Sequence, residues 1–357
     1  DLRRRARLGL TEATAATTTG IVAGLYDALR PTVLASTDRR HRPAPGGRPA
    51  EPGDALVLAT SGTTGSPKGV VLTHDAVAAA ARSTSAALAV DPAADTWICC
   101  LPLAHAGGLG VVTRALLTGT PLVVLAGFDP ETVSVAAEGA GRALVSLVAT
   151  ALRRVDPGRF RVILLGGDAP PDWPDGRPGP VVVTYGLTET GGGCVYDGAA
   201  LAGVEVRVDP EGEVWLRGPL LGRAYRTASA DLPLAGPDGW FATGDGGRIG
   251  PDGRLEVDGR LADVIVTGGE KVWPTAVEHV LARCPGVDAV AVVGRPDPEW
   301  GQRVVALVVP GAQPPTLEDL RVAVRDELGP WAAPKDLELV ADLPRTDLGK
   351  VRRTTLR

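Results

Sequence analysis

The sequence predicts an α/β fold: a large N-terminal α/β domain with an added small β subdomain, and a small α+β C-terminal domain. Three observations lead to it. Short β-like runs alternate with helical stretches through most of the first 200 residues. From about residue 203 short strands are separated by Gly, Pro and Asp turns, and after residue 260 helices and strands mix again. Each pattern is typical of a different layer arrangement.

The first region contains the runs expected to form buried strands, at 55–59, 96–103, 121–125, 143–148, 161–166 and 180–185. Ala-rich or amphipathic stretches separate several of them, and one of these predicts a helix over 73–90. Thr73 is placed to cap its first turn, because a threonine oxygen can accept from a free amide there. Strands alternating with helices predict a largely parallel sheet.

The later regions read differently. VEVRVD, EVWLRG and GRLEVDG predict an antiparallel sheet or small barrel attached to the first domain. Beyond Gly259 and Arg260, helices are expected at about 274–283 and 316–328, between strands DAVAVVG, RVVALVVP and LELVAD. The predicted domains are therefore 1–259 and 260–357. The Gly/Pro-rich segment 42–53 reads as a surface linker.

Composition excludes several classes of function. The chain of 357 residues is 44% apolar, yet it has no unbroken apolar run of about 20 residues, so we expect no membrane span. Its net charge of −5 argues against a nucleic-acid partner. The four cysteines and four histidines lack zinc-ligand spacing. Cys99 and Cys100 are expected to pack as small apolar side chains, and a reducing, cytoplasmic setting fits best.

The segment TSGTTGSPKG follows the first strand and predicts a phosphate-binding loop. Its glycines permit close backbone approach to an anion, its hydroxyls can donate, and its lysine supplies a compact charge. Only four of the 37 cationic residues are lysines. A lysine in this loop therefore indicates a position that favours a compact, mobile ammonium over the planar guanidinium of arginine. A flexible Gly/Ser surface linker is the alternative, and the spacing is not that of a Walker A motif. The candidate nucleotide contacts are Thr60, Ser61, Gly62, Thr63, Thr64, Gly65 and Lys68.

Five further motifs accompany this loop, in a fixed order along the chain. They are LPLAHAGGLG (101–110), YGLTET (185–190), GWFATGDGGRI (239–249), GRLADVIVTGGEKVWP (259–274) and PRTDLGK (344–350). Together with the loop they resemble the signatures of the adenylate-forming superfamily, which includes acyl-CoA synthetases, peptide-synthetase adenylation domains and luciferases. The resemblance covers nearly the whole chain from residue 55 onward.

The resemblance implies ATP, Mg²⁺ and coenzyme A as cofactors or co-substrates. It implies that Glu189 helps to hold Mg²⁺ and that Thr188 contacts the α-phosphate. Tyr185 would lie against the adenine ring, with the backbone of the GGDAPP segment (166–171), including Gly167 and Asp168, at its edge. Asp245 would accept from both ribose hydroxyls, and Arg260 would add a ribose or phosphate contact. In isolation Tyr185 and Thr188 could simply end a strand, and Asp245 could be a turn residue.

The resemblance also implies a mobile C-terminal domain. Lys350 would reach into the active site and bridge the acyl carboxylate and the α-phosphate. Rotation would then withdraw it and present a face around Gly268 and Gly269 to the thiol, with Lys271 either part of that face or a plain surface residue. The expected hinge position is occupied by Ala262, where Asp or Lys is common in the family.

Three stretches, 146–155, 185–208 and 296–309, resemble more closely the o-succinylbenzoate–CoA ligases of menaquinone biosynthesis, in particular the short actinobacterial type. The implied reaction converts 2-succinylbenzoate, ATP and coenzyme A to 2-succinylbenzoyl-CoA, AMP and pyrophosphate. The small residues at 191–194 would leave room for an aromatic acid, and His105 would contact the acyl group or gate its entry. Arg114 is a candidate partner for the second carboxylate, although it could equally be a solvated helix residue.

Other functions remain open at this point. Another aryl- or acyl-CoA ligase of a specialised pathway would carry the same core motifs, and so would a stand-alone adenylation protein that loads a carrier protein. A catalytically silent binding protein is disfavoured by the retention of the catalytic-type residues. The expected partners are a small carboxylic acid, ATP and CoA, with a homodimer left open.

Overall fold

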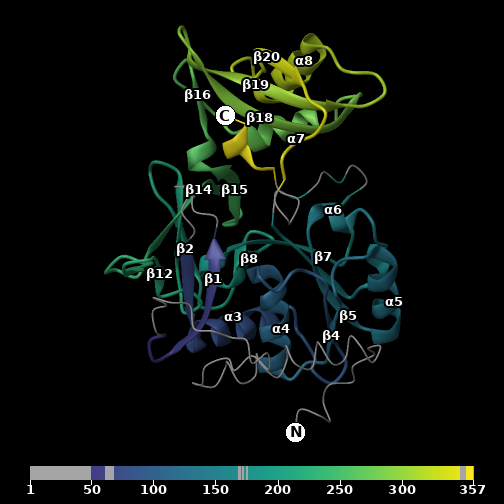
Figure 1. Ribbon diagram of the computed structural model, residues 1–357, viewed down its shortest axis with the longest axis vertical. Coiled ribbons are helices and arrows are strands. Elements are labelled where there is room, and N and C mark those ends of the chain that lie inside the picture. The colour runs from purple at the N-terminus through teal and green to yellow at the C-terminus, as the bar shows by residue number, and fades with distance from the viewer. Residues whose placement is uncertain are drawn as a thin grey trace. The chain divides into compact units, whose positions relative to one another are not determined.

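The computed structural model describes residues 50–60, 68–167, 170, 173, 176–345 and 351–356 (Figure 1). By packing, the chain divides into two compact units. The first holds the described residues up to Pro170, with 176–206 and Leu216–Phe241. The second holds Arg207–Trp215 and the described residues from Ala242 onward. The predicted domain boundary near residue 260 falls inside the second unit and stays a prediction.

The centre of the first unit is a seven-stranded sheet in the order β4-β3-β5-β6-β7-β8-β9. Its first five strands run parallel and the last two pairings are antiparallel. This confirms the predicted α/β domain. The strands are β3 (Thr96–Cys99), β4 (Leu122–Val124), β5 (Ala143–Leu147), β6 (Val162–Leu165), β7 (Val181–Leu187), β8 (Gly192–Tyr196) and β9 (Ala199–Ala200).

The helices of this unit are α3 (His74–Ala87), α4 (Ala106–Thr118), α5 (Pro130–Ala140) and α6 (Ala149–Leu152), with short 3₁₀ turns η1 (Pro157–Arg159) and η2 (Thr188–Thr190). Helices α4, α5 and α6 connect successive parallel strands of the sheet, and α3 leads into its first strand in the chain, β3. The Thr73 hydroxyl accepts from the Ala76 amide at 3.1 Å, as the predicted cap requires. α4 ends at Gly119, whose φ of 72° closes the helix in the left-handed conformation that glycine adopts freely.

The strand before the phosphate loop differs from its prediction. β1 (Asp54–Thr60) belongs to a separate antiparallel sheet, β1-β2-β12-β13, with β2 (Lys68–Thr73), β12 (Ala224–Arg226) and β13 (Asp231–Pro233). β1 is not fully buried, because its side chains alternate: Leu58 packs inward while Val57 is 47% exposed. The loop leads into strand β2 before α3 begins, and the β-branched residues Val70 and Val71 favour that extended conformation.

The second unit begins with most of a four-stranded sheet, β10-β11-β14-β15, where an antiparallel sheet or barrel was expected. Its strands are β10 (Glu205–Val208), β11 (Glu213–Arg217), β14 (Phe241–Ile249) and β15 (Leu255–Arg260), and β14 and β15 pair antiparallel. The motif GWFATGDGGRI therefore lies largely on β14. The turn η3 (Leu261–Asp263) follows β15 and contains Ala262.

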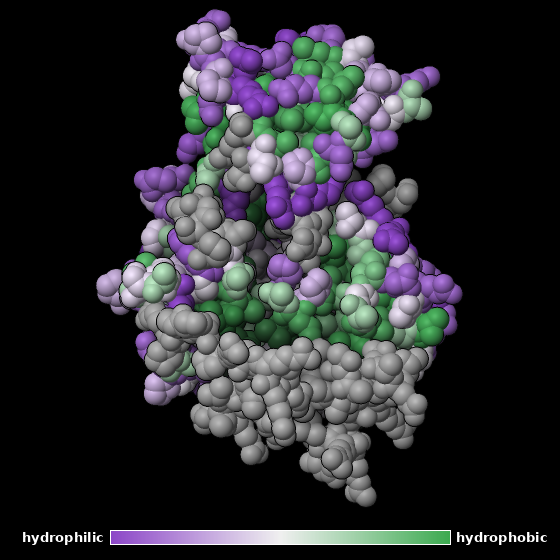
Figure 2. Space-filling model, in the orientation of Figure 1, coloured by the Kyte–Doolittle hydropathy of each residue, from purple (hydrophilic) through white to green (hydrophobic). Residues whose placement is uncertain are grey.

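The rest of the second unit is the predicted α+β unit. Its sheet has the order β17-β16-β19-β18, with β20 parallel to β19. One core cluster joins α7 and α8 to this sheet, and a second gathers around Leu343. Apolar residues of this unit show among hydrophilic ones in Figure 2. The elements are β16 (Ile265–Thr267), β17 (Glu270–Val272), α7 (Pro274–Leu281), β18 (Val287–Asp297), β19 (Gly301–Pro310), α8 (Leu317–Leu328), β20 (Asp336–Leu339) and η4 (Arg353–Thr355).

Candidate functional site

The predicted phosphate loop joins the two strands of the β1–β2 hairpin. Thr60 and Lys68 are partners in the register of that hairpin, so the two ends of the loop meet at the edge of a well-packed sheet. Val70 and Leu72, further along β2, are buried and anchor it. The remaining predicted contacts in this loop, Ser61, Gly62, Thr63, Thr64 and Gly65, lie outside the described residues.

Tyr185, Thr188 and Glu189 lie together at the end of β7. Tyr185 pairs with Val195 of β8, and the chain then turns through η2. Thr190 fixes that turn: its buried hydroxyl accepts from the Leu187 amide at 2.9 Å and lies 2.6 Å from the Gly192 carbonyl. The sequence therefore places a tyrosine, a threonine and a carboxylate on one short, rigid segment.

The Glu189 carboxylate is held from β12. The Tyr225 hydroxyl donates to Glu189 Oε1 at 2.7 Å, and the Gly222 amide donates to the Glu189 carbonyl at 2.7 Å. The Lys68 ammonium lies 5.3 Å from the centre of the Tyr225 ring, within cation–π range. Glu189, the predicted metal ligand, and Lys68, the predicted phosphate ligand, thus both contact Tyr225.

The donor set fits Mg²⁺ bound together with a nucleotide. Within the part of the chain that the structure describes, no three His, Cys, Asp or Glu side chains cluster as a complete metal site. Mg²⁺ does not need one, because it prefers oxygen ligands and is usually held by one or two carboxylates plus phosphate oxygens and water. Glu189 offers a fixed carboxylate of this kind.

Two further nucleotide candidates lie on β14 and β15 of the second unit. Asp245 is 5% exposed, and Arg260 Nε lies 3.0 Å from its Oδ1. They are register partners across the two strands, and Arg260 also donates to the Thr243 carbonyl at 3.1 Å. Asp245 is thus a buried carboxylate paired with a half-exposed cation.

The remaining predicted contacts are placed in part. Gly167 follows β6 with a φ of 95°, whereas Asp168 and Lys350 lie outside the described residues. Gly268 and Gly269 form the turn between β16 and β17, with φ values of 59° and 89°. A Cβ on Gly268 would lie 2.6 Å from the Trp300 ring, so only glycine fits there.

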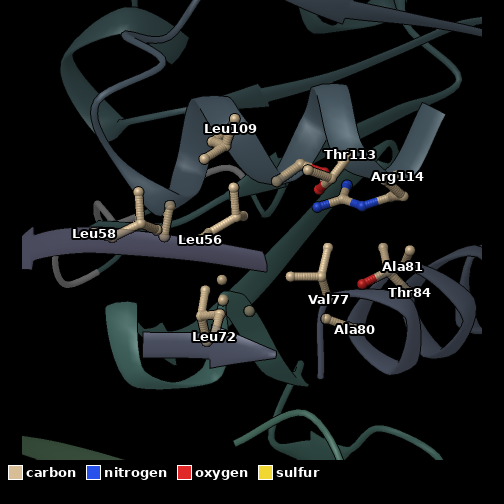
Figure 3. Close-up of a pocket in the computed structure, with 15 residues that line it drawn as sticks. Leu56, Leu58, Leu72, Val77, Ala80, Ala81, Thr84, Leu109, Thr113 and Arg114 are labelled. Atoms are coloured by element: carbon tan, nitrogen blue, oxygen red, sulfur yellow. The ribbon is translucent and has the colours of Figure 1, made fainter. Parts of the chain in front are cut away.

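A pocket in the first unit lies between α3, α4 and the β1–β2 hairpin (Figure 3). Its walls are mainly apolar. They comprise Leu56, Leu58 and Leu72 from the hairpin, Val77, Ala80, Ala81 and Thr84 from α3, Leu109, Thr113 and Arg114 from α4, and the backbone of 191–193. His105, expected at the acyl group, immediately precedes the pocket residue Ala106 and starts α4.

Arg114 is the one cation among the described lining residues of this pocket. It is 7% exposed, and its guanidinium stacks on the buried Trp97 ring at 4.5 Å. Figure 3 shows that guanidinium extending from α4 into the space between α4 and α3. Its Nη1 is buried and has no hydrogen-bond partner among the described residues, and burial lowers its pKa below the usual range. The alternative of a solvated helix residue was therefore wrong.

The glycines at 191–193 make one pocket wall out of backbone. Gly191 and Gly192 have φ values of 65° and 134°, which side-chain-bearing residues rarely adopt. A Cβ on Gly193 would lie 2.7 Å from the Tyr196 ring. Opposite them on β7, a Cβ on Gly186 would lie 2.0 Å from the Gly192 carbonyl oxygen. This close approach of the two backbones leaves that wall of the pocket without large side chains.

The cysteines pack as small apolar side chains, as predicted for Cys99 and Cys100. Burial raises the pKa of Cys99 to about 11 and that of Cys100 to about 12. It raises the pKa of Cys194, next to the glycine wall, to about 12 as well. These thiols stay protonated near neutral pH, which excludes them as nucleophiles.

Three residues at these sites carry no distinctive signal in the sequence. Tyr225 acts through a hydrogen bond to a residue distant in the chain, and Thr190 through hydrogen bonds across a turn. Trp97 of β3 stacks against Arg114 of α4. Tyr225 stands in the unremarkable run GRAYRT. Only the pairing of β12 with β2 brings it to the site.

Comparisons with known proteins agree with this geometry. A family model described as "AMP-binding enzyme" matches residues 8–226, and one described as "AMP-binding enzyme C-terminal domain" matches 276–350. The chain belongs to the AMP-binding enzyme family. The resemblance to adenylate-forming enzymes is thereby confirmed, and so is the predicted two-part fold.

Individual relatives share most of the chain. A probable 2-succinylbenzoate–CoA ligase of Mycobacterium tuberculosis is 42% identical over 325 residues, which are 85% of this chain and 83% of the relative. An indoleacetate–CoA ligase of Aromatoleum aromaticum is 34% identical, over 85% of this chain and 66% of the relative.

Among solved structures, the o-succinylbenzoate–CoA synthetase of Bacillus subtilis with its acyl-adenylate intermediate matches with a TM-score of 0.77. It is 28% identical and covers 85% of this chain and 69% of its own. The same synthetase in complex with ATP and a magnesium ion matches with a TM-score of 0.75 at 28% identity, over 85% of this chain and 70% of its own.

Proposed function

We propose that the protein is an AMP-forming acid–CoA ligase whose substrate is 2-succinylbenzoate. In the first half-reaction one carboxylate oxygen attacks the α-phosphorus of ATP, forming the acyl-adenylate and releasing pyrophosphate. In the second, the thiol of coenzyme A attacks the acyl carbon, and AMP leaves as 2-succinylbenzoyl-CoA forms. The thiol proton passes to solvent or to the leaving group.

The observation that carries this proposal is the buried guanidinium of Arg114, whose Nη1 has no hydrogen-bond partner among the described residues, in an apolar pocket. A buried cation without a partner is costly, and a carboxylate with matching geometry removes that cost through paired charge-assisted hydrogen bonds. The walls around it, Leu58, Val77 and Leu109, suit an aromatic ring. A substrate with a ring, one carboxylate for Arg114 and a second for activation is a diacid of the 2-succinylbenzoate type.

The other residues supply the nucleotide side of the reaction. We propose that Lys68 and the hairpin loop bind the phosphates that leave as pyrophosphate, with Thr188 at the α-phosphate and Tyr185 against the adenine. Mg²⁺, when bound at Glu189, would neutralise phosphate charge. Asp245 and Arg260 would bind the ribose, and Lys350 would stabilise the charge that develops as the carboxylate attacks. Gly268 and Gly269 would line the approach of the thiol.

The relatives support this assignment: those named for 2-succinylbenzoate match over most of the chain. Among the described residues no helix is long and apolar enough to cross a membrane. We place the enzyme in the cytoplasm, where its free cysteines would stay reduced. A homodimer remains a proposal that sedimentation of the purified protein would test.

A second candidate is an aryl-CoA ligase for an acid with a single carboxylate. The apolar pocket walls and the indoleacetate-named relative favour it, and Arg114 argues against it. A protein that loads a carrier protein would form the same acyl-adenylate and differ from a CoA ligase only in the thiol that accepts the acyl group. Both are separated from the first proposal by which acid and which thiol the enzyme uses.

The test is an ATP–pyrophosphate exchange screen over carboxylic acids. We expect 2-succinylbenzoate to exceed 3-benzoylpropionate, which lacks the aromatic carboxylate, by about 100-fold in kcat/KM, as loss of a buried ion-pair partner implies. Arg114→Met should remove most of this preference and leave the monoacid rate nearly unchanged. Arg82→Met, an exposed position on α3, is the control.

Equal use of both acids by the wild-type protein would contradict the diacid assignment. Exchange followed by transfer to a phosphopantetheinyl carrier protein, with none to coenzyme A, would contradict the CoA assignment. No exchange with any acid would contradict the proposed function altogether.

A further inference from the structure

Tyr225 lies between two groups that the proposed function assigns to the nucleotide. Its hydroxyl donates to Glu189 Oε1 at 2.7 Å, and its ring centre lies 5.3 Å from the Lys68 ammonium. One side chain therefore contacts both the proposed Mg²⁺ ligand and the proposed phosphate ligand.

Strand register explains how Tyr225 reaches both groups. β12 pairs antiparallel with β2, and Tyr225 is opposite Val70. Residues two apart on a strand face the same side, so Lys68 lies diagonal to Tyr225 on one face of the sheet. The long tyrosine ring spans that diagonal and presents its hydroxyl to η2.

The same segment holds the backbone of Glu189. The Gly222 amide donates to the Glu189 carbonyl at 2.7 Å, three residues before Tyr225. A Cβ on Gly222 would lie 2.9 Å from the Val71 carbonyl oxygen, so a larger residue would push this segment away from β2. Residues 222–225 thus fix Glu189 both at the main chain and at the carboxylate.

Tyr225 also stands in place of a direct ion pair between Lys68 and Glu189, which would compete with nucleotide binding. The described residues Lys68 and Glu189 form no ion pair with each other, although both contact the same ring. A direct pair would satisfy the ammonium with the carboxylate and withdraw both from an incoming nucleotide. A neutral hydroxyl occupies only Oε1, and a ring face satisfies the ammonium weakly, so both charges remain available.

We propose that Tyr225 is a positioning residue that orients Glu189 toward Mg²⁺ and keeps Lys68 from pairing with it. The inference rests on the proposed function, because its ligand is Mg²⁺·ATP. It assigns Tyr225 a role in metal-dependent nucleotide binding, separate from any role in packing β12 against β2.

The experiment measures ATP binding by calorimetry on the full chain, with Mg²⁺ and with EDTA. Tyr225→Phe keeps the ring and removes the hydrogen bond. We expect about tenfold weaker binding of ATP in Mg²⁺ and unchanged binding in EDTA, as loss of one hydrogen bond to a charged group implies. Tyr225→Leu removes both contacts and should weaken binding in EDTA as well, because Lys68 is then free to pair with Glu189.

Tyr196→Phe is the matched control. It removes a buried tyrosine hydroxyl of the first unit, which is hydrogen-bonded to Thr84 at 3.0 Å, and should leave the Mg²⁺ dependence unchanged. Wild-type Mg²⁺ dependence in Tyr225→Phe would overturn the inference. Equal weakening with Mg²⁺ and EDTA, together with a lower unfolding temperature, would also overturn it and indicate a packing role. Absence of ATP binding in the wild-type protein would instead overturn the proposed function itself.

Discussion

Asp245 is a buried carboxylate whose surroundings suit a vicinal diol. Asp245 is only 5% exposed, and Arg260 Nε lies 3.0 Å from one of its oxygens, which offsets part of the cost of burying the carboxylate. A charged carboxylate with two oxygens can accept from two hydroxyls at once. These are the properties that binding of a ribose needs.

We predict that Asp245→Ala weakens ATP binding about 10- to 100-fold, as loss of hydrogen bonds to a charged group implies. The specific readout is discrimination between ATP and its 2′,3′-dideoxy analogue, measured by calorimetry. The wild-type protein should prefer ATP, and the variant should bind both nucleotides equally.

Asp258→Asn is the control for this prediction, because Asp258 lies on β15 and pairs with Arg248 at 2.9 Å. It should retain the preference for ATP. A variant at position 245 that still prefers ATP over the dideoxy analogue would show that another group binds the ribose.

At the residue scale the sequence predicted side chains that lie within motifs, and it missed those that act across the fold. Thr188, Glu189 and Asp245 stand in recognisable runs, although their roles stay predictions. Tyr225 could not be found, because its contact with Glu189 joins residues 36 apart through the pairing of two strands. A local sequence pattern does not predict the register between strands that are distant in the sequence.

At the scale of elements, an ion-pair network joins three strands of the smaller sheet. Arg223, the residue before β12, binds Asp54 of β1 through two bonds, of 2.6 and 2.8 Å, and Asp231 of β13 at 2.8 Å. Arg226 adds contacts to both aspartates. The Asp54 side chain is 3% exposed, and the hydrogen bond from Arg223 holds its pKa below the ordinary value of 3.8.

We predict that Asp54→Asn lowers the free energy of unfolding at pH 7 by roughly 3 kcal/mol, because it leaves Arg223 without its main partner. The folded-state pKa of Asp54 is depressed, so its contribution is present above pH 3.8 and is lost as the pH falls through the folded-state value. Thermal unfolding measured between pH 3 and pH 7 should therefore show the gap to wild type narrowing toward acid.

Asp252→Asn provides the comparison for this pH series. Asp252 is an exposed turn residue paired with Arg254 at 3.4 Å, and its loss should cost little at any pH. A constant gap for Asp54→Asn over the whole range would mean that the lost stability comes from packing and not from ionisation.

Helices were easier to predict than strands in this chain. The predicted Thr73 cap of α3 is a local hydrogen bond, and α8, predicted over 316–328, begins after a similar cap at Thr316. β2 and β14 were not predicted as strands, because each lies within a glycine-containing motif that reads as a loop. Their extended form depends on partners, β1 and β12 for β2, and β15 for β14, that are separate in sequence.

At the scale of the whole molecule, the proposed reaction uses phosphate and acid contacts of the first unit, and ribose contacts and Lys350 of the second. Both family models match, one to each part of the chain. The predicted movement of residues 260–357 about Ala262 stays a proposal. Because the proposed reaction has two half-reactions, measuring each one separately tests the role of Lys350 without observing the movement of residues 260–357.

We predict that Lys350→Ala slows pyrophosphate exchange by at least about 100-fold, since it removes a charge that stabilises the transition state of adenylation. Thioester formation from supplied acyl-adenylate and coenzyme A should stay within about threefold of wild type, because the lysine is not needed there. Stopped-flow measurement of each half-reaction checks this.

Arg352→Ala removes an exposed cation two residues further on and should change neither half-reaction. If Lys350→Ala slowed both steps equally, the lysine would act in substrate binding or folding and not in one step alone.

The glycine wall of the acid pocket limits how this enzyme can diverge. A side chain at 186 or 191–193 would meet backbone strain, atoms within 3 Å, or both. Larger residues on that side of the pocket are therefore expected to disrupt the fold. Ala80 and Ala81 line the pocket from α3, where the helical backbone conformation accepts side chains larger than alanine. New acid preferences, in nature or in directed evolution, are therefore expected to arise by substitutions on α3, while the glycine wall is inherited unchanged.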